Sequence, residues 1–419
     1  MNKIAWVVPS LKTGLGKYTK SVIKKLKKFF HLDIFVGESR FKLDDFSGYQ
    51  TIIYNFSNTR ESTSLYLAIR KYPGIAILHD RTYHHFFAYY YLEYLNNQKL
   101  YYQILNQLYG EKIAKYAKIK NNSGISIWET EECLKFPMRE LIYPYTTAII
   151  VHSKSYEEVI KSEYDGEVTY LPLPFSDISI SNNFQNFIDV NQEKIKLFSY
   201  GFLSENRMIE EILKLIGEIP ELKKRIIYFI AGSIHDAYLN KIKLVISNYK
   251  LDKIVKLLGF LSDEELYKYI SISDICINLR KYNTEGASWS LLEQMFFGKA
   301  VVVFDNEFYS EFPDNVLVKI KKFEDLADKL LEIINNPSIT ISIGNMAKSY
   351  VVANFNPERY CQEFIKFLNN TCVNREKKKL LYNFMKNIVE STSFLSPKIE
   401  KRFFYELSNS ILEIFYRES

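Results

Sequence analysis

A chain of 419 residues is long for one hydrophobic core and comfortable for two domains, and its 25% of charged residues is typical of a globular protein. The net charge of +6 comes from lysines and arginines spread along the whole chain, which argues against a nucleic-acid-binding protein. No run approaches the ~18 apolar residues of a spanning helix, and the first residues lack the apolar segment of a secretory signal. We therefore expect a cytoplasmic protein that at most lies on a membrane surface.

The first half of the chain predicts alternating strands and helices. A buried strand at Lys3–Val8 stops at Pro9, and a loop that contains Gly14 and Gly16 leads into a helix ending near Phe30. The lysines of this helix are expected to cover its exposed surface or, alternatively, to sit on anionic lipid headgroups. Further strands are predicted at Leu32–Val36, Thr51–Asn55, Ile75–Leu78, Ala148–Val151 and Val168–Leu171, with helices at Glu61–Lys71, about 84–116 and Ser153–Ser162.

The second half restarts the same alternation after a polar stretch at 175–194, which is a plausible interdomain linker. Its strands are predicted at Lys196–Tyr200, Arg225–Ala231, Val255–Leu258, Asp274–Leu279, Ala300–Phe304 and Val316–Lys319, and its last helices at about 322–335, 338–353 and 357–369. The fold class is therefore α/β, with two doubly wound, Rossmann-like domains (1–180 and 195–370) facing a cleft. A helical tail at 371–419, with helices at about 375–390 and 397–416, is expected to pack back on the first domain or to mediate contacts.

One stretch of the second half, Glu285–Glu293, predicts an anion-binding site. Its two carboxylates stand eight positions apart, so on one helix they can face the same way. Gly286, Ala287 and Ser288 are small and would leave backbone N–H groups open at the helix start, where an anion is stabilised.

Three other loops fall at predicted strand ends in the same half. The loop from Gly201 contains Arg207, a cation for a diphosphate, and the loop Gly259–Leu261 has a backbone that can bind the edge of a base. The third loop is Gly232–Ser233. A ribose needs a carboxylate for its hydroxyls and a transferred sugar needs another, roles that we assign to Glu293 and Glu285. The expected ligand is therefore a nucleoside diphosphate sugar.

Histidines and cysteines do not predict a metal site. His84 and His85 are adjacent and point apart on a helix, and the spacing with His79 and Asp80 matches no standard ligand set. A hydrogen bond from His79 to a sugar is the preferred interpretation. The four cysteines have neither metal nor redox spacing, which suits free thiols: Cys133, Cys276, Cys361 and Cys372. No triad order, GxxxxGK motif or dinucleotide fingerprint is present, so no further cofactor is predicted.

Four stretches of the second half together carry a family resemblance: Gly259–Leu266, Ile277–Arg280, Glu285–Gly298 and Ala300–Val303. They resemble the retaining glycosyltransferases of family 4, which have the two-domain GT-B fold and an E-x7-E motif, matched here by Glu285 and Glu293. The first half resembles a bacterial surface-polysaccharide branch of that family, at Tyr54–Asn58, Tyr72–Asp80 and Val151–Ser153.

The resemblance implies roles for the matching residues. Glu285 would lie by the donor sugar, Glu293 by the ribose, and the loop at Gly259 by the base. On the acceptor side, His79 would approach the transferred sugar, and Gly14 and Gly16 would let acceptor and phosphate come close. Asn58 and Asp80 fall on the same side.

Some positions depart from the family pattern. The family often has arginine where this chain has Phe202, lysine where it has Arg207, and glycine where it has Ser288. One diphosphate cation is therefore missing, and we predict that Arg280 replaces it.

The predicted activity is retaining transfer of a sugar from a nucleoside diphosphate to an acceptor hydroxyl, without a metal. The acceptor is a glycan, a lipid-linked oligosaccharide or a protein, and bacterial surface glycan synthesis is the expected context. Alternatives are an inverting transferase, a sugar-nucleotide epimerase, or a catalytically silent partner subunit that binds the sugar nucleotide. The last alternative is favoured by Phe202.

Overall fold

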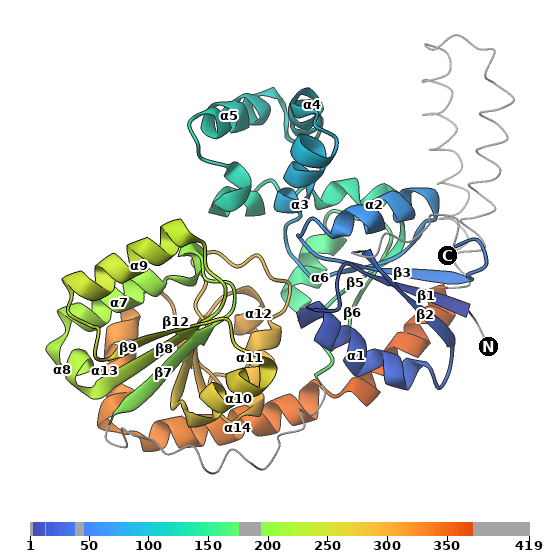
Figure 1. Ribbon diagram of the computed structural model, residues 1–419. Coiled ribbons are helices and arrows are strands. Elements are labelled where there is room, and N and C mark those ends of the chain that lie inside the picture. Colours follow the sequence, from blue (N-terminus) through green and yellow to red (C-terminus); the bar gives the residue numbers. More distant parts are fainter. Residues whose placement is uncertain (1–2, 13, 38–45, 176–193, 372–419) are drawn as a thin grey trace, which may run out of the picture. The chain divides into compact units, whose positions relative to one another are not determined.

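The computed structural model describes residues 3–12, 14–37, 46–175 and 194–371. Within these residues it contains two parallel six-stranded sheets, each with helices packed on its faces (Figure 1). The strand orders are β2-β1-β3-β4-β5-β6 and β12-β11-β10-β7-β8-β9. Both orders reverse direction beside the first strand of the sheet, which is the topological switch point where doubly wound sheets bind ligands. The predicted α/β class with two Rossmann-like domains is confirmed.

The first sheet contains the six strands that the apolar runs predict. Its central strands are buried along their whole length, as β3 shows with six buried residues of six, because helices cover both faces of a parallel sheet. The strands are β1 (Lys3–Val8), β2 (His31–Val36), β3 (Thr51–Phe56), β4 (Gly74–Leu78), β5 (Thr146–Val151) and β6 (Glu167–Tyr170). The flanking helices are α1 (Gly14–Leu26), α2 (Ser62–Lys71) and α6 (Lys154–Lys161).

The second sheet likewise follows the predicted alternation. Its strands are β7 (Ile195–Tyr200), β8 (Ile226–Ala231), β9 (Val255–Gly259), β10 (Ile275–Ile277), β11 (Ala300–Phe304) and β12 (Val318–Ile320). Its helices are α7 (Ile209–Glu218), α8 (Pro220–Arg225), α9 (Asp236–Asn248), α10 (Asp263–Ile272), α11 (Trp289–Phe296), α12 (Glu307–Ser310), α13 (Asp325–Asn335) and α14 (Ser338–Asn354).

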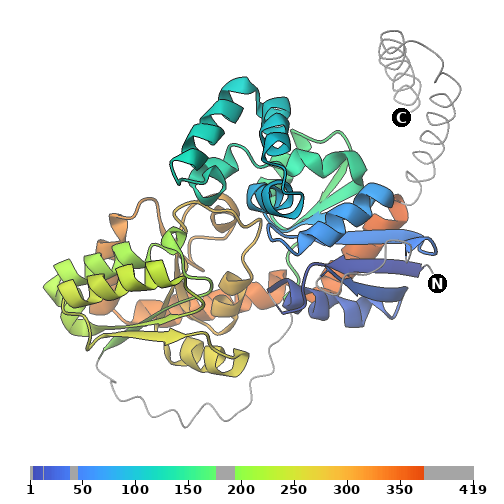
Figure 2. The same ribbon diagram turned by 45° about the horizontal axis from the view of Figure 1, so that its top comes forward.

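A long helical excursion separates β4 from β5. The single helix predicted over about 84–116 is broken, because Asn96 and Gly110 have φ angles of 47° and 88°, which a helix cannot contain. Asn97 then caps the next helix through its side chain. The segments are α3 (His84–Tyr89), η3 (Tyr90–Tyr94), α4 (Gln98–Tyr109), α5 (Glu111–Asn122) and the short turns η4 (Ile127–Glu129), η5 (Glu131–Leu134), η6 (Arg139–Leu141) and η7 (Tyr143–Tyr145). Figures 1 and 2 show α4 and α5 side by side, outside the layers of the first sheet.

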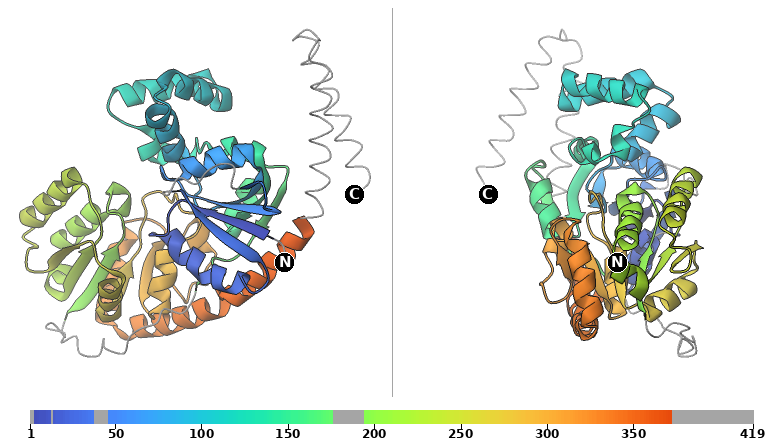
Figure 3. Two further views of the ribbon diagram at one scale, coloured as in Figure 1. Left: turned by 45° about the vertical axis from the view of Figure 1, so that its right-hand side comes forward. Right: turned by 90° about the vertical axis from the view of Figure 1, so that its left-hand side faces the viewer.

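The helix after α14 returns to the first sheet. The Tyr360 hydroxyl lies 2.5 Å from the hydroxyl of Tyr18 in α1, and the ring of Phe364 lies 5.8 Å from that of Trp6 in β1. Figure 3 shows this orange-red helix beside α1. We assigned residues 195–370 to the second domain, but the helix at the end of this range therefore packs on the first domain.

Three further predictions have different outcomes. Nearly all of the linker at 175–194, and the tail helices at 375–390 and 397–416, lie outside the described residues. Cys133, Cys276 and Cys361 are buried free thiols, as expected. Ser153 does begin α6, but its hydroxyl makes no capping hydrogen bond.

None of the described helices is both long and apolar enough to cross a bilayer.

Candidate functional site

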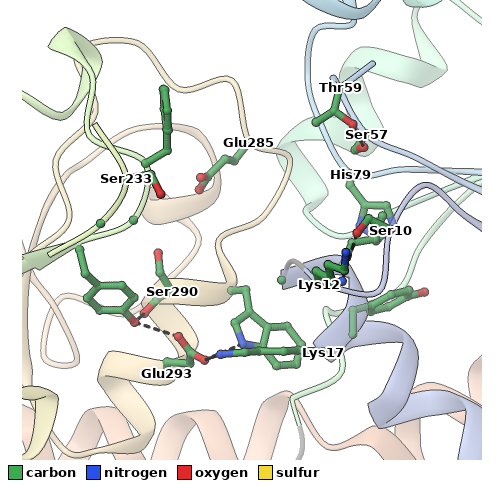
Figure 4. Close-up of a pocket in the computed structure, with 18 of the residues that line it drawn as sticks. Ser10, Lys12, Lys17, Ser57, Thr59, His79, Ser233, Glu285, Ser290 and Glu293 are labelled. Atoms are coloured by element: carbon green, nitrogen blue, oxygen red, sulfur yellow. Dashed lines mark hydrogen bonds and ion pairs between the residues drawn. The ribbon is translucent and has the colours of Figure 1, made fainter. Parts of the chain in front are cut away.

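A cavity of ≈ 720 Å³ is lined by the carboxyl ends of strands from both sheets (Figure 4). The first sheet contributes residues that follow β1, β3 and β4, and the second sheet contributes residues that follow β7 and β8 together with the start of α11. β1 and β3 flank the switch point of the first sheet and β7 borders that of the second, so the cavity lies where the topology predicts a ligand site.

Nine of the predicted site residues line this cavity: Glu285, His79, Arg207, Glu293, Ala287, Gly201, Leu261, Gly14 and Asp80. Six others lie outside its lining: Gly286, Ser288, Arg280, Gly259, Gly16 and Asn58.

Glu285 and Glu293 do not share a helix, contrary to the prediction. Helix α11 begins only at Trp289, and Ser288 caps it by accepting a hydrogen bond from the N–H of Leu291. Glu285 instead lies in an extended stretch that forms an antiparallel bridge with Asp80 of the first sheet.

Gly286 is committed to that bridge. Its N–H donates to the carbonyl oxygen of His79 at 2.8 Å, so this amide is not open to an anion as predicted. A Cβ at Gly286 would come within 2.9 Å of the same oxygen, which explains the glycine by close approach of the two backbones. The anion cradle therefore lacks one of its three expected N–H donors.

Two arginines keep Glu285 charged. Arg280 Nη2 lies 3.0 Å from Glu285 Oε1, while Oε2 accepts no hydrogen bond from a described residue. Burial alone would raise the pKa of Glu285, but Arg280 and Arg207 outweigh it and hold the pKa below its ordinary value. The cavity lining therefore contains a negatively charged carboxylate, with Oε1 paired to Arg280 and Oε2 buried.

Arg207 and Arg280 occupy different places around this carboxylate. Arg207 lines the cavity, and burial together with Arg280 lowers its pKa to about 9, so it stays charged at neutral pH. Arg280 is 5% exposed and donates to Asn278 Oδ1 as well as to Glu285. In this structure Arg280 supports Glu285 from outside the cavity lining, which does not favour its predicted contact with a diphosphate.

Glu293 meets a lysine from the opposite sheet. Lys17 Nζ lies 2.8 Å from Glu293 Oε1 and 3.0 Å from Asp263 Oδ1, as Figure 4 shows for the first pair. Burial lowers the pKa of Lys17, but Glu293 and Asp263 more than compensate and raise it. The prediction that Lys17 belongs to the solvated face of its helix is wrong.

Aromatic donors complete the surroundings of Glu293. Trp289 Nε1 donates to Oε1 at 3.0 Å and the Tyr200 hydroxyl donates to Oε2 at 3.0 Å. With 2% of its surface exposed, the Glu293 carboxylate accepts hydrogen bonds from three described side chains, Lys17, Trp289 and Tyr200. Because so little of Glu293 is exposed, a ligand hydroxyl would reach the carboxylate by displacing one of these partners.

His79 is held as a neutral imidazole. Burial, and secondarily His152 with its ring 5.0 Å away, lowers the pKa of His79 well below its ordinary value. Its Nε2 lies 3.3 Å from Asn55 Oδ1, which can only accept, so Nε2 carries the proton and Nδ1 remains an acceptor. His152 satisfies a local contact, with Nδ1 2.8 Å from the carbonyl oxygen of Leu171.

Asp80 is positioned by Asn58. The Asn58 N–H donates to Asp80 Oδ2 at 2.8 Å, and the Asn58 side chain accepts from the N–H of Phe86. Burial raises the pKa of Asp80 to about 7, the Asn58 bond opposes this, and the nearby Glu285 carboxylate adds to it. Asn58 thus acts on the cavity through Asp80.

We expect Asp80 to make the protein less stable as the pH rises. The unfolded chain loses this proton near its ordinary pKa of 3.8, whereas the folded protein keeps it up to about 7. The stabilisation is therefore complete at low pH and is lost as the pH rises through 7. The free energy of unfolding of the wild type, minus that of Asp80→Asn, should fall by about 2 kcal/mol between pH 5 and pH 8 in urea titrations. A difference that does not vary with pH would contradict this assignment.

The glycines before α1 do not lie in a loop as predicted. Gly14 and Gly16 both belong to the first turn of α1. A Cβ at Gly16 would lie 2.0 Å from the carbonyl oxygen of Leu11, so this glycine is required by its own preceding turn and not by a ligand. Gly14 lines the cavity with room for a Cβ, which would lie 3.7 Å from Trp289.

The loop after β9 places Leu261 and Phe260 at the cavity. Gly259 has a φ of 68°, and its carbonyl oxygen accepts from the N–H of Gly232 at 2.7 Å. Phe260 is 81% exposed beside Leu261, which leaves an apolar ring available to a planar ligand.

Sequence reasoning missed several polar residues of the lining. Ser10 and Lys12 follow β1, and Ser57 and Thr59 follow β3. The rule that pointed to His79, a polar side chain at the carboxyl end of a strand, applies equally to these positions. Lys17 had no comparable signal, because its partner lies 276 positions away.

Comparisons with known proteins agree with this geometry. Residues 181–350 match the family described as Glycosyl transferases group 1. An uncharacterised glycosyltransferase of Methanocaldococcus jannaschii is 26% identical over 236 residues, which cover 54% of this chain and 59% of that protein. The poly(ribitol-phosphate) alpha-N-acetylglucosaminyltransferase of Staphylococcus aureus is 23% identical over 168 residues, 39% of this chain and 32% of that protein. The chain thus matches less than two thirds of the length of either relative.

A solved structure is similar to this chain over most of its length. HepE from Anabaena, crystallised in complex with UDP-glucose, superimposes with a TM-score of 0.62 at 14% identity, covering 88% of this chain and 100% of HepE. The chain thus combines the GT-B fold with a carboxyl-terminal domain that matches the Glycosyl transferases group 1 family, which supports a role in glycosyl transfer.

Proposed function

We propose that this protein is a retaining glycosyltransferase of family 4, which moves a sugar from a nucleoside diphosphate to an acceptor hydroxyl. The observation that carries the proposal is the arrangement of Glu285, Glu293 and Arg207 around one cavity. A charged carboxylate, a second carboxylate and a cation are the groups that a sugar, a ribose and a diphosphate require.

The donor half of the cavity suggests one binding pose. The ribose hydroxyls would take the place of Lys17 at Glu293, and the diphosphate would lie between Arg207 and the loops at Gly201 and Gly232. Phe260 and the backbone at Leu261 would contact the base. HepE, which shares the fold, binds UDP-glucose, and a uridine donor is therefore the first to test.

The family resemblance suggests the chemical step that we propose. The acceptor oxygen attacks the anomeric carbon on the face that the diphosphate leaves, the bond from that carbon to the phosphate oxygen breaks, and the phosphate oxygen takes the acceptor proton. Glu285 would stabilise positive charge on the sugar ring, and Arg207 the departing diphosphate. Because side chains meet the phosphate charge, we propose that no metal is required.

The first sheet would hold the acceptor, through His79, Asp80 and the hydroxyls of Ser57 and Thr59. A relative acts on poly(ribitol-phosphate), as its name states, which favours a surface glycan as the acceptor; a lipid-linked oligosaccharide or a protein is the alternative. We propose that transfer takes place in the cytoplasm, at most at the inner face of the plasma membrane.

Phe202 favours a second candidate, a catalytically silent subunit that binds a sugar nucleotide. The ring lines the cavity and is 54% exposed, where the family resemblance leads us to expect an arginine. Binding of the donor without turnover would support this candidate.

The test is an assay of the purified protein with a panel of nucleoside diphosphate sugars. We expect one donor to raise the melting temperature and to be hydrolysed or transferred in excess EDTA. The anomeric proton coupling in the NMR spectrum of the product should show the configuration of the donor. A product of inverted configuration would indicate an inverting transferase, and an epimerised sugar would indicate an epimerase; either would overturn the proposal. Loss of turnover in EDTA would overturn metal independence.

A further inference from the structure

The helical excursion after β4 contains a second hollow, away from the cavity described above. A groove of ≈ 410 Å³ runs between α4 and α5, with the buried Ala114 as its floor. Its walls carry amide, phenol and ammonium groups, from Gln98, Lys99, Tyr102, Gln103, Asn106, Glu111, Lys115 and Lys118. Most of the exposed surface of the groove is apolar, and the polar ends of these side chains are the groups that can bind an anionic or hydroxylated ligand.

Positive charge is concentrated on these two helices. Residues 98–122 contain five lysines and one glutamate, a net charge of +4 in a chain whose total is +6. The glutamate, Glu111, pairs with Lys115 at 2.7 Å. Neither Lys99 nor Lys118 forms an ion pair within the described part of the chain, so two ammonium groups of the groove have no counter-charge.

The positive charge of the walls suits a phosphate polymer. Residues 98–122 contain five lysines, and lysine binds phosphate as a point charge. Gln98, Gln103 and Asn106 add side-chain amides for hydroxyl groups. The Tyr102 ring is held in place because its hydroxyl accepts a hydrogen bond from Asn121 Nδ2 at 3.0 Å.

The excursion also contacts the loop that carries Glu285. The Tyr282 hydroxyl donates to the carbonyl oxygen of Glu129 at 2.8 Å, and Glu129 ends the η4 turn of the excursion. Tyr282 N–H in turn bonds to Asn206 Oδ1, next to Arg207. A ligand in the groove therefore lies on an element that touches the active-site loop.

We propose that the groove between α4 and α5 is a docking site for a linear polymer with repeated phosphate groups, such as a polyol phosphate. It would hold the acceptor chain while one of its hydroxyls enters the cavity. This inference rests on the proposed transferase function, since it assigns the acceptor class of the same site.

The test measures binding without catalysis. Fluorescently labelled poly(glycerol phosphate) is titrated with the full chain at low salt and without a donor. We expect Lys99→Gln/Lys118→Gln to weaken binding about tenfold. Lys20→Gln/Lys24→Gln removes the same charge from the exposed face of α1 and should leave binding unchanged. Equal weakening by both pairs would show unspecific attraction and overturn the proposal.

Two further measurements distinguish a phosphate polymer from a membrane surface, and test the groove separately from the proposed transferase function. Binding to phosphatidylglycerol vesicles that depends on Lys99 and Lys118, with none to the polymer, would make the groove a membrane contact and also overturn the proposal. Donor hydrolysis by Lys99→Gln/Lys118→Gln should equal that of the wild type, while its KM for the polymer rises. If the wild type binds the polymer but turns over no donor, the proposed transferase function is wrong and the proposed binding site in the groove is still supported.

Discussion

Replacing Glu285 by glutamine is expected to lower kcat about a hundredfold to a thousandfold, the usual effect of removing one group that stabilises charge in a transition state. The substitution keeps the shape of the side chain and removes the negative charge next to the proposed sugar position. It also leaves Arg280, 3.0 Å from Oε1, beside Arg207 without an anion between them. Turnover of the donor identified by the panel, at saturating concentration, measures the effect.

The loss of charge at Glu285 also affects stability. An arginine that is 5% exposed loses its partner, and we expect the free energy of unfolding to fall by about 2–4 kcal/mol. Activity is therefore compared below the unfolding transition of the variant. Glu264→Gln is the matched control, because this acid is exposed on α10 and its one ion pair with a described residue is with Lys268. A kcat for Glu285→Gln within threefold of that control would refute the role of Glu285.

The two arginines are expected to have separable roles. Arg207→Gln should raise the Kd for the nucleoside diphosphate tenfold to a hundredfold, about 1.4–2.8 kcal/mol, because Arg207 lines the cavity. Arg280→Gln should lower kcat with less than a threefold change in that Kd, because its guanidinium bonds to Asn278 and Glu285. Isothermal titration with the diphosphate and kinetics with the donor measure the two quantities.

The opposite outcome has a definite meaning. If Arg280→Gln weakens diphosphate binding as much as Arg207→Gln does, Arg280 moves into the cavity on binding. It then supplies the positive charge that the family's arginine would give at the position of Phe202. Thermal unfolding of both variants controls for misfolding, since each leaves a charged cluster incomplete. The pair is therefore more informative than either substitution by itself.

Much of the fold is determined by local sequence. The central strands of both sheets are continuous apolar runs, because helices cover both faces of a parallel sheet, and such runs are visible without a structure. The polar residues at their carboxyl ends, among them His79, Arg207 and Glu285, could be assigned to one cleft because both sheets were expected to be doubly wound. The excursion after β4 was less predictable, since a single asparagine and a glycine decide where its helices break.

The tertiary structure alone decided how the predicted acids and cations are used. Glu285 lies outside α11 because its backbone pairs with Asp80 of the other sheet, and Gly286 gives its N–H to His79 in the same bridge. Lys17 of α1 pairs with Glu293 of α11, 276 positions away. Each of these contacts joins segments that lie far apart in the sequence. The sequence by itself therefore determined the strands of both sheets and nine residues of the cavity lining, and the packing of distant segments determined how those groups are paired.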